Sequence, residues 1–137
     1  MGGRILIADD TVTDRIALKA RLATARHRVT QARHGDELVA AMRAERPDVV
    51  LMDIDFPGGG IAACKALKAH AGMREVPVIL YGAPDETAAR VAAFEAGAEE
   101  CLTALPGENL LLALLRNLIR RHAELSELRH RQALHCS

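Results

Sequence analysis

The chain has 137 residues, of which half are hydrophobic and about a quarter are charged, a composition typical of one globular domain. Equal numbers of basic and acidic residues give a formal net charge of zero, which argues against direct binding of nucleic acid. The apolar runs are too short to span a membrane. Cys64, Cys101 and Cys136 are scattered without a CxxC pair, which favours a reduced, cytoplasmic protein.

Short apolar runs alternate with segments of helical periodicity along the whole chain. The runs predict five strands, at residues 4–8, 29–32, 49–52, 78–81 and 100–103. The periodic segments predict five helices, at residues 11–25, 35–46, 61–71, 85–97 and from about 108 onward. Alternation at this spacing indicates right-handed crossovers and a parallel sheet.

Turn and capping residues mark the boundaries of several elements. Three consecutive glycines in residues 57–60 predict a loop after the third strand. Asp85 is predicted to cap the fourth helix, and Gly97 is predicted to end it. The spacing of Val91 and Phe94 predicts that both side chains lie on the inner face of that helix.

Two of the predicted strands end in acidic residues. The first runs into Asp9 and Asp10, and the third runs into Asp53. An uninterrupted apolar run is typical of a strand buried on both faces of a parallel sheet. Ligand sites in such sheets lie beyond the carboxyl ends of the strands, so the three carboxylates converge if the strands are neighbours. Their mutual repulsion favours a divalent cation, and oxygen ligands favour Mg²⁺.

Three blocks of sequence together resemble the receiver domain of bacterial two-component response regulators. They are ILIADD at residues 5–10, VLMDIDFP at residues 50–57 and GAEE at residues 97–100. Their spacing also fits, and the resemblance covers residues 3 to about 120. It implies an α/β fold of the flavodoxin-like class, with a doubly wound five-stranded parallel sheet in the order 2-1-3-4-5 and helices on both faces.

The resemblance also implies roles for the acidic residues. Asp53 is expected to accept a phosphoryl group from a histidine kinase or a phosphotransfer protein. Asp10 and Asp53 are expected to bind Mg²⁺ directly, Asp9 largely through water, and the backbone carbonyl of Asp55 completes the protein ligands. The domain is then a signalling module that catalyses at most its own phosphorylation, rather than an enzyme.

The chain departs from the family pattern at three switch positions. Gly82 stands where the family has a threonine or serine at the end of strand four, and Ala104 stands where it has a lysine. Cys101 replaces the usual aromatic residue of strand five. Two hypotheses follow: a phosphoacceptor with altered switching, or a phosphate-independent pseudo-receiver that acts as a dimerisation or docking module.

Other interpretations of the acidic and glycine residues are weaker. Three isolated strand-end acids facing water are the alternative to a site. The sequence DID at residues 53–55 also resembles the nucleophile motif of haloacid-dehalogenase-type phosphatases, but that family carries it on the first strand. The glycines at residues 58–60 lack the spacing of a phosphate-binding loop. The six histidines show no metal-ligand spacing, and most are expected at the surface.

The last helical pattern continues beyond the expected end of the domain. We expect a receiver domain at residues 1–121 and an extension of the last helix at residues 122–137. Leu118, Leu125 and Leu128 are the candidate contacts for a homodimer or a linker, with a short coiled-coil seam favoured over a frayed tail. In this respect the chain resembles receivers that precede a diguanylate cyclase or another output domain.

Overall fold

The computed structural model describes residues 2–11 and 26–135. The strands are β1 (Arg4–Ala8), β2 (Arg28–Ala32), β3 (Val49–Asp53), β4 (Val78–Tyr81) and β5 (Glu100–Cys101). The helices described are α2 (Gly35–Glu45), α3 (Gly60–Ala69), α4 (Thr87–Glu95) and α5 (Glu108–His135). The helix predicted over residues 11–25 lies, apart from Thr11, outside the described residues, and so does Cys136.

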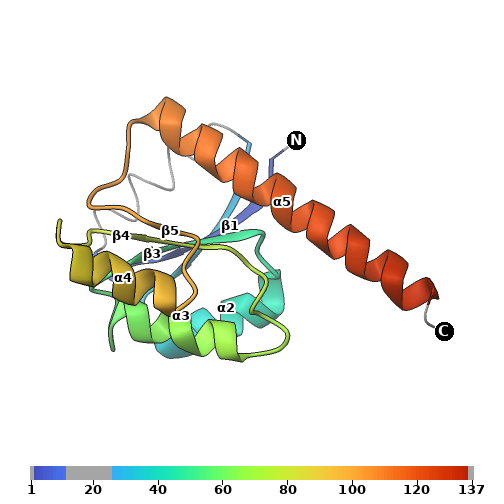
Figure 1. The fold of residues 1–137 in the computed structure, drawn as a ribbon, viewed down its shortest axis with the longest axis horizontal. Helices are drawn as coiled ribbons and strands as arrows, with labels where there is room; N and C mark the ends of the chain where they lie inside the picture. The colour runs from blue at the N-terminus through green and yellow to red at the C-terminus, as the bar shows by residue number, and fades with distance from the viewer. Residues whose placement is uncertain (1, 12–25, 136–137) are drawn as a thin grey trace.

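All five strands pair in parallel, in the order β2-β1-β3-β4-β5 (Figure 1). This confirms the predicted topology. The chain winds outward in one direction from β1 to β2 and then in the other direction from β3 to β5. The switch point therefore lies between β1 and β3, where a doubly wound sheet places its ligand site.

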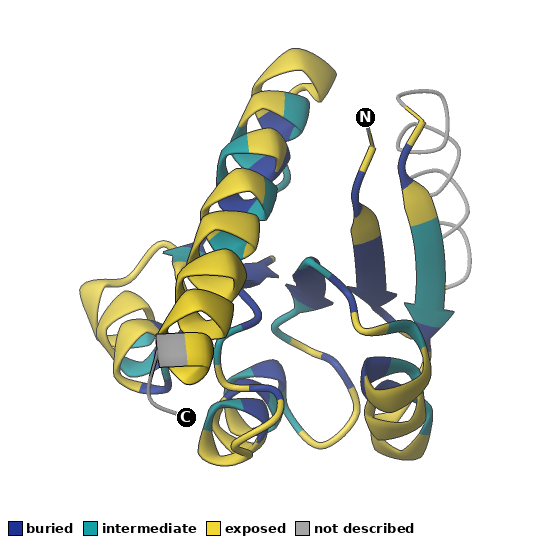
Figure 2. Ribbon diagram, turned by 90° about the vertical axis from the view of Figure 1, so that its right-hand side faces the viewer, coloured by how far each residue is buried: buried dark blue, intermediate teal, exposed yellow. Residues whose placement is uncertain are grey.

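Apolar side chains form one core layer on each face of the sheet. On one face, residues of α2, α3 and α4 pack on alternate strand residues such as Leu6, Val50 and Leu80. On the other face, α5 packs Leu111 and Leu115 on the intervening strand residues. Figure 2 shows that β1 and β3 are buried for most of their length, as expected of central strands covered on both faces.

The orientation predicted for α4 is wrong. Val91 and Phe94 are 47% and 51% exposed, and the buried residue of the helix is Ala93. Small alanine side chains face the sheet here and let the helix pack close to it, so the larger apolar residues face outward. The predicted cap also differs, because the helix begins after Glu86 without a side-chain cap and Asp85 forms an ion pair with Arg90 instead.

The GAEE motif has a structural role at the amino-terminal ends of β4 and β5. Gly97 has a φ of 100°, a left-handed conformation that favours glycine and ends α4. The carboxylate of Glu99 accepts the N–H of Val78 at 2.8 Å and pairs with the Lys68 ammonium group. Lys68 also donates to the carbonyl of Val76 at 2.9 Å. These bonds tie α3 to the beginning of β4.

Helix α5 is much longer than the sheet requires. Its 28 residues span about 42 Å at the usual rise per residue, and its second half projects beyond the sheet (Figure 1). Leu118 is 5% exposed and packs in the core, whereas Leu125 and Leu128 are 41% and 51% exposed. The proposal of Leu118 as a partner contact is therefore wrong, because the sheet already covers it. No described helix is long and apolar enough to cross a membrane.

Candidate functional site

The acidic residues meet at the carboxyl ends of two neighbouring strands. Strands β1 and β3 pair in register, with Ala8 opposite Met52, so Asp9 and Asp53 follow the last paired residues. Asp9 is 1% exposed, Asp53 is half-buried, and Asp10 and Asp55 are exposed. The structure thus brings together the residues that the sequence predicted, at the switch point of the sheet.

Main-chain hydrogen bonds hold Asp53 and the loop that follows it. Oδ1 of Asp53 accepts the N–H of Asp55 at 2.7 Å, and its carbonyl accepts the N–H of Phe56 at 3.0 Å. The predicted loop over residues 57–60 is one residue too long, because Gly60 is the first residue of α3. A Cβ on Gly60 would lie 2.5 Å from the carbonyl oxygen of Asp53. Glycine at this position lets α3 start directly beside the strand end.

The negative charges of the cluster act on one another. Burial raises the pKa of the Asp53 carboxyl group above its usual value, and its acidic neighbours raise it further. The N–H of Asp55 acts in the opposite direction. Asp53 therefore carries its charge against both desolvation and repulsion, a situation that a bound cation would relieve.

Asp9 has a partner that the sequence did not reveal. The hydroxyl of Tyr81, at the end of β4, donates to Oδ2 of Asp9 at 2.7 Å, and the N–H of Thr11 donates to Oδ1 at 2.8 Å. We predicted Tyr81 only as a strand residue. The sequence did place this tyrosine at the carboxyl end of a predicted strand, near the acids. Because a buried tyrosine hydroxyl usually forms a hydrogen bond, this position was a signal for a contact with the acid cluster.

The residues present fit a Mg²⁺ ion that keeps several water ligands. Among residues 2–11 and 26–135, no three His, Cys, Asp or Glu side chains are grouped so as to hold a metal ion. The predicted set has only two direct carboxylates, from Asp10 and Asp53, together with one carbonyl oxygen. Mg²⁺ is commonly bound in this way, through one or two carboxylates and water.

The three unusual residues lie in different surroundings. Gly82 directly follows β4, and a Cβ built on it would lie 3.5 Å from Oδ1 of Asp53. Ala104 is exposed in the loop after β5. Cys101 is buried, and burial raises the pKa of its thiol, as expected of a core residue.

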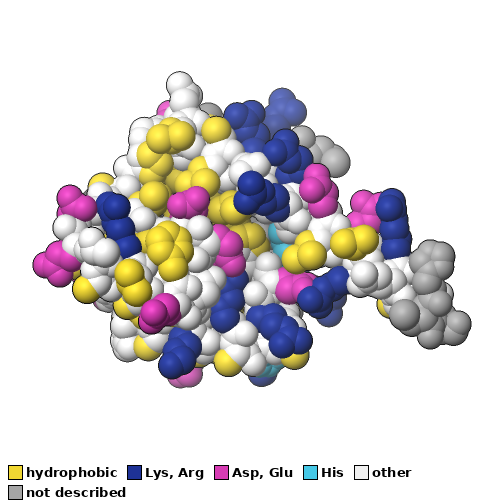
Figure 3. Space-filling view, viewed as in Figure 1, with side chains coloured by type: hydrophobic (Ala, Val, Ile, Leu, Met, Phe, Trp, Pro, Cys, Tyr) yellow, Lys and Arg dark blue, Asp and Glu magenta, His cyan; other side chains and the backbone are white. Residues whose placement is uncertain are grey.

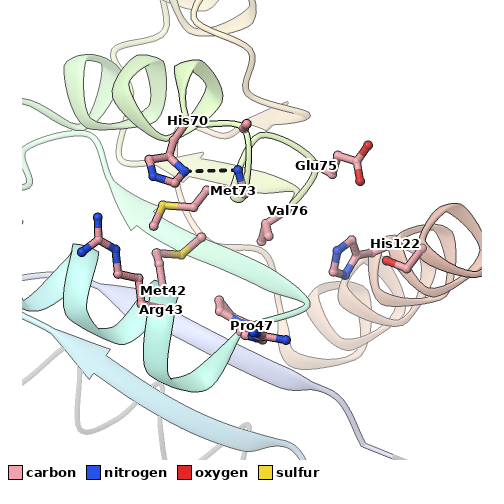
Figure 4. A pocket seen from close by; sticks show the side chains of 12 residues that line it. Met42, Arg43, Pro47, His70, Met73, Glu75, Val76 and His122 are labelled. Carbon is pink, nitrogen blue, oxygen red and sulfur yellow. Dashed lines mark hydrogen bonds between the residues drawn. The ribbon is translucent and has the colours of Figure 1, made fainter. Parts of the chain in front are cut away.

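A pocket of about 540 Å³ lies at the opposite end of the sheet (Figure 4). Pro47 and Val76, which precede β3 and β4, line it together with Met42 and Met73. Figure 4 shows that it is bounded by the end of α2, the segment before β4 and the second half of α5. Since the acids lie at the carboxyl ends of the strands, this pocket is separate from the acid cluster.

Two polar contacts beside this pocket attach the second half of α5 to the domain. Nδ1 of His122 lies 3.4 Å from Oδ1 of Asp48, without hydrogen-bond geometry. The His122 ring and the N–H of Arg4 hold the pKa of Asp48 below its usual value. Arg129 pairs with Glu75 about two turns further along α5. The first half of the extension is therefore anchored to the domain.

This combination of fold and acid cluster defines the class of protein. The five-stranded parallel sheet in the order 2-1-3-4-5, with acids at the ends of β1 and β3, is the architecture of a receiver domain. The family model for the response regulator receiver domain matches residues 5–120. The chain belongs to this family.

Two relatives differ in how much of their length this chain matches. Response regulator PleD of Caulobacter vibrioides is 34% identical over 134 residues, which cover 97% of this chain and 30% of PleD. Protein PilH of Pseudomonas aeruginosa is 38% identical over 117 residues, which cover 85% of this chain and 97% of PilH. The chain thus spans under a third of PleD but nearly all of PilH.

Solved structures of receiver domains superpose closely on the chain. One is the receiver domain of a sensor histidine kinase from Pseudomonas aeruginosa, with a magnesium ion coordinated in its active-site cleft. It matches with a TM-score of 0.76 and 27% identity, over 87% of this chain and 98% of that one. The beryllofluoride-activated receiver domain of RstA from Klebsiella pneumoniae matches with a TM-score of 0.76 and 28% identity, over 85% and 98%.

Proposed function

We propose that the chain is a phosphoacceptor receiver that takes a phosphoryl group on Asp53 with the help of Mg²⁺, and that its switching is altered. The observation that carries this proposal is that Asp9 and Asp53 directly follow the paired residues Ala8 and Met52, at the switch point of the sheet. Family membership supports it, since receiver domains act in two-component signalling. The phosphoryl donor is a histidine kinase or a phosphotransfer protein.

The geometry of Asp53 suits nucleophilic attack by one of its oxygens. Within the described part of the chain, Oδ1 of the Asp53 carboxylate accepts a hydrogen bond and Oδ2 accepts none. Oδ2 is therefore available for the reaction. Oδ2 forms a bond to phosphorus as the bond from phosphorus to the donor imidazole nitrogen breaks, and the imidazole leaves as the neutral base after taking up a proton. A bound Mg²⁺ ion would neutralise charge on the transferring group.

The reaction is expected to be slow because two donors to the phosphoryl group are replaced. Gly82 offers no hydroxyl and Ala104 offers no ammonium group. Removing one donor to a charge that develops in a transition state typically costs roughly 100- to 1000-fold in rate. A receiver that keeps such a donor should therefore react faster with the same small phosphodonor by about this factor.

Acetyl phosphate with Mg²⁺, followed by intact-protein mass spectrometry, tests the proposal. We expect slow addition of one phosphoryl group to the wild type, none to Asp53→Asn, and an unchanged rate in Asp36→Asn, which removes an exposed carboxylate in the first turn of α2. Phosphorylation of Asp53→Asn at the wild-type rate would refute the assignment.

The replaced donors also support a second function, that of a phosphate-independent docking module. Beryllofluoride, which mimics a phosphoryl group on aspartate, separates the two. If neither it nor acetyl phosphate reacts with the wild type, the docking function is favoured. In either case we infer that α5 joins the receiver to a partner copy or to an output domain, of the diguanylate cyclase or another class.

A further inference from the structure

Tyr81 connects the acid cluster to the interior of the fold. It is the last residue of β4 and is 6% exposed, with its side chain in the core layer beneath α5. Strand β3 lies between β1 and β4, so the Tyr81 hydroxyl reaches past the central strand to bond Asp9. The carbonyl of Tyr81 accepts the N–H of Ile54 at 2.9 Å. One residue therefore contacts both acid-bearing strand ends.

Asp9 is held by donors on both of its carboxylate oxygens. The N–H of Thr11 holds Oδ1 and the hydroxyl of Tyr81 holds Oδ2. A charged group buried this deeply requires such bonds, and hydrogen bonds to a carboxylate are stronger than those between neutral groups. Because the two donors come from different segments, they fix the rotation of the carboxylate about its own axis.

The side chains that would act on this cluster in the family pattern are missing. Within residues 2–11 and 26–135, the carboxylates of Asp9 and Asp53 accept hydrogen bonds from the N–H groups of Thr11 and Asp55 and from the hydroxyl of Tyr81. Tyr81 thus supplies a side-chain donor to the buried acid of this cluster. Its hydroxyl is not part of the resemblance on which the site was predicted.

We propose that the Tyr81 hydroxyl is a positioning group for the Mg²⁺ site. It holds Asp9 in one orientation, in which the carboxylate binds a water of the ion's shell while Asp10 and Asp53 bind the ion directly. This inference rests on the proposed function, since it assumes that the acid cluster binds Mg²⁺. Partners of metal ligands orient them, and their removal typically costs roughly 10- to 100-fold in metal affinity.

The composition of the chain allows Tyr81 to be followed by its intrinsic fluorescence. The chain has one tyrosine and no tryptophan, so its intrinsic emission comes from Tyr81. Tyrosine emission depends on the hydrogen bonding of the hydroxyl. Titration of the wild type with Mg²⁺ should therefore change the emission along the same binding curve that calorimetry records. Mg²⁺ binding seen by calorimetry without any change in emission would overturn the proposal.

The variant Tyr81→Phe tests the hydroxyl directly, because phenylalanine keeps the buried ring. We expect calorimetry to show Mg²⁺ affinity at least tenfold weaker than in the wild type. The matched control is Ile79→Val, which trims a buried side chain on the same strand and the same face without touching Asp9. Its Mg²⁺ affinity should equal that of the wild type. If affinity were lost only because packing on this face is loosened, both variants would lose it.

The outcomes separate this inference from the function on which it rests. Equal affinity in wild type and Tyr81→Phe, or tighter binding in the variant, overturns the positioning role and leaves the phosphoacceptor proposal intact. An equal loss in Ile79→Val also overturns it. If the wild type itself binds no Mg²⁺, both the inference and the metal-dependent function fail.

Discussion

Gly82 lacks the hydroxyl of the family pattern, and its backbone conformation disfavours any residue that would restore it. Its φ is 80°, a conformation that residues with a side chain rarely adopt, and it lies beside the Asp53 carboxylate. We expect Gly82→Ala to lower the free energy of unfolding by about 1–3 kcal/mol, the usual cost of holding an ordinary residue in this conformation. Urea denaturation measures it.

The control for this prediction is Gly107→Ala. Gly107 has no positive φ, and a Cβ there meets nothing within 4 Å, so this variant should change stability little. Equal stability of Gly82→Ala and wild type would show that β4 can end in another conformation, and that a threonine at position 82 could be accommodated.

His27 makes stability depend on pH. Its ring is buried, unlike the surface position expected of most histidines, and Nδ1 accepts the N–H of Gly3 at 3.0 Å. Burial, and next the charge of Arg116, lower the pKa of His27 below 6.5. The unfolded chain therefore binds the proton more readily than the folded one, so stability is full above the unfolded pKa and is lost as the pH falls below it.

We expect His27→Gln to lose less stability than the wild type between about pH 7 and pH 5, around the unperturbed histidine pKa. Thermal unfolding at a series of pH values measures this. His130→Gln, which changes an exposed histidine on α5, should follow the wild-type curve. A His27→Gln curve parallel to that of the wild type would show that His27 does not contribute to the pH dependence.

At the scale of the element, the two halves of α5 have different surroundings. Its first half packs on the sheet, and its second half carries an exposed apolar stripe with Leu125 and Leu128. Figure 3 shows hydrophobic side chains along this projecting part and also over α4 and the beginning of α5, where Val91, Phe94 and Leu110 are exposed. Because contiguous exposed apolar surface is typical of contact sites, we propose that this part of α5 is one.

We expect α5 to form a parallel dimer that depends on concentration, because so short a seam is marginal by itself. Sedimentation should show weaker association for a chain truncated after Arg121 and for Leu125→Ala combined with Leu128→Ala. Leu134→Ala removes another exposed leucine, from the opposite side of the helix, and should leave association unchanged. Undiminished association of the truncated chain would exclude α5 as the dimer element.

At the scale of the whole molecule, the missing donors should limit how far a phosphoryl signal spreads. Beryllofluoride and Mg²⁺ should shift amide resonances near Asp9, Asp10 and Asp53 in NMR spectra. Ala83, Cys101 and α4 should shift little, because neither Gly82 nor Ala104 can draw its loop toward the new group. Asp53→Asn should show no beryllofluoride shifts. Large shifts at Ala83 and Cys101 would reveal a switch that does not need these two side chains.

The sequence by itself determined the strand and helix alternation, the topology and the position of the acids. The alternation follows from local periodicity and from turn residues. The strand order, which makes the acid-bearing strands neighbours, was implied by the resemblance to receiver domains. The departures at Gly82, Cys101 and Ala104 could also be identified, because each is a missing group at a position defined by neighbouring motifs. The continuation of α5 was likewise visible as an unbroken helical pattern.

Only the tertiary structure decided which side chains meet across the fold. Tyr81 and Asp9 are 72 residues apart, and their contact depends on the width of β3 between them and on the face to which Tyr81 points. The outward position of Phe94 depends on how closely the alanines of α4 approach the sheet, and the burial of Leu118 depends on where α5 leaves it. Periodicity indicates that a residue lies on a face, but packing decides what that face meets.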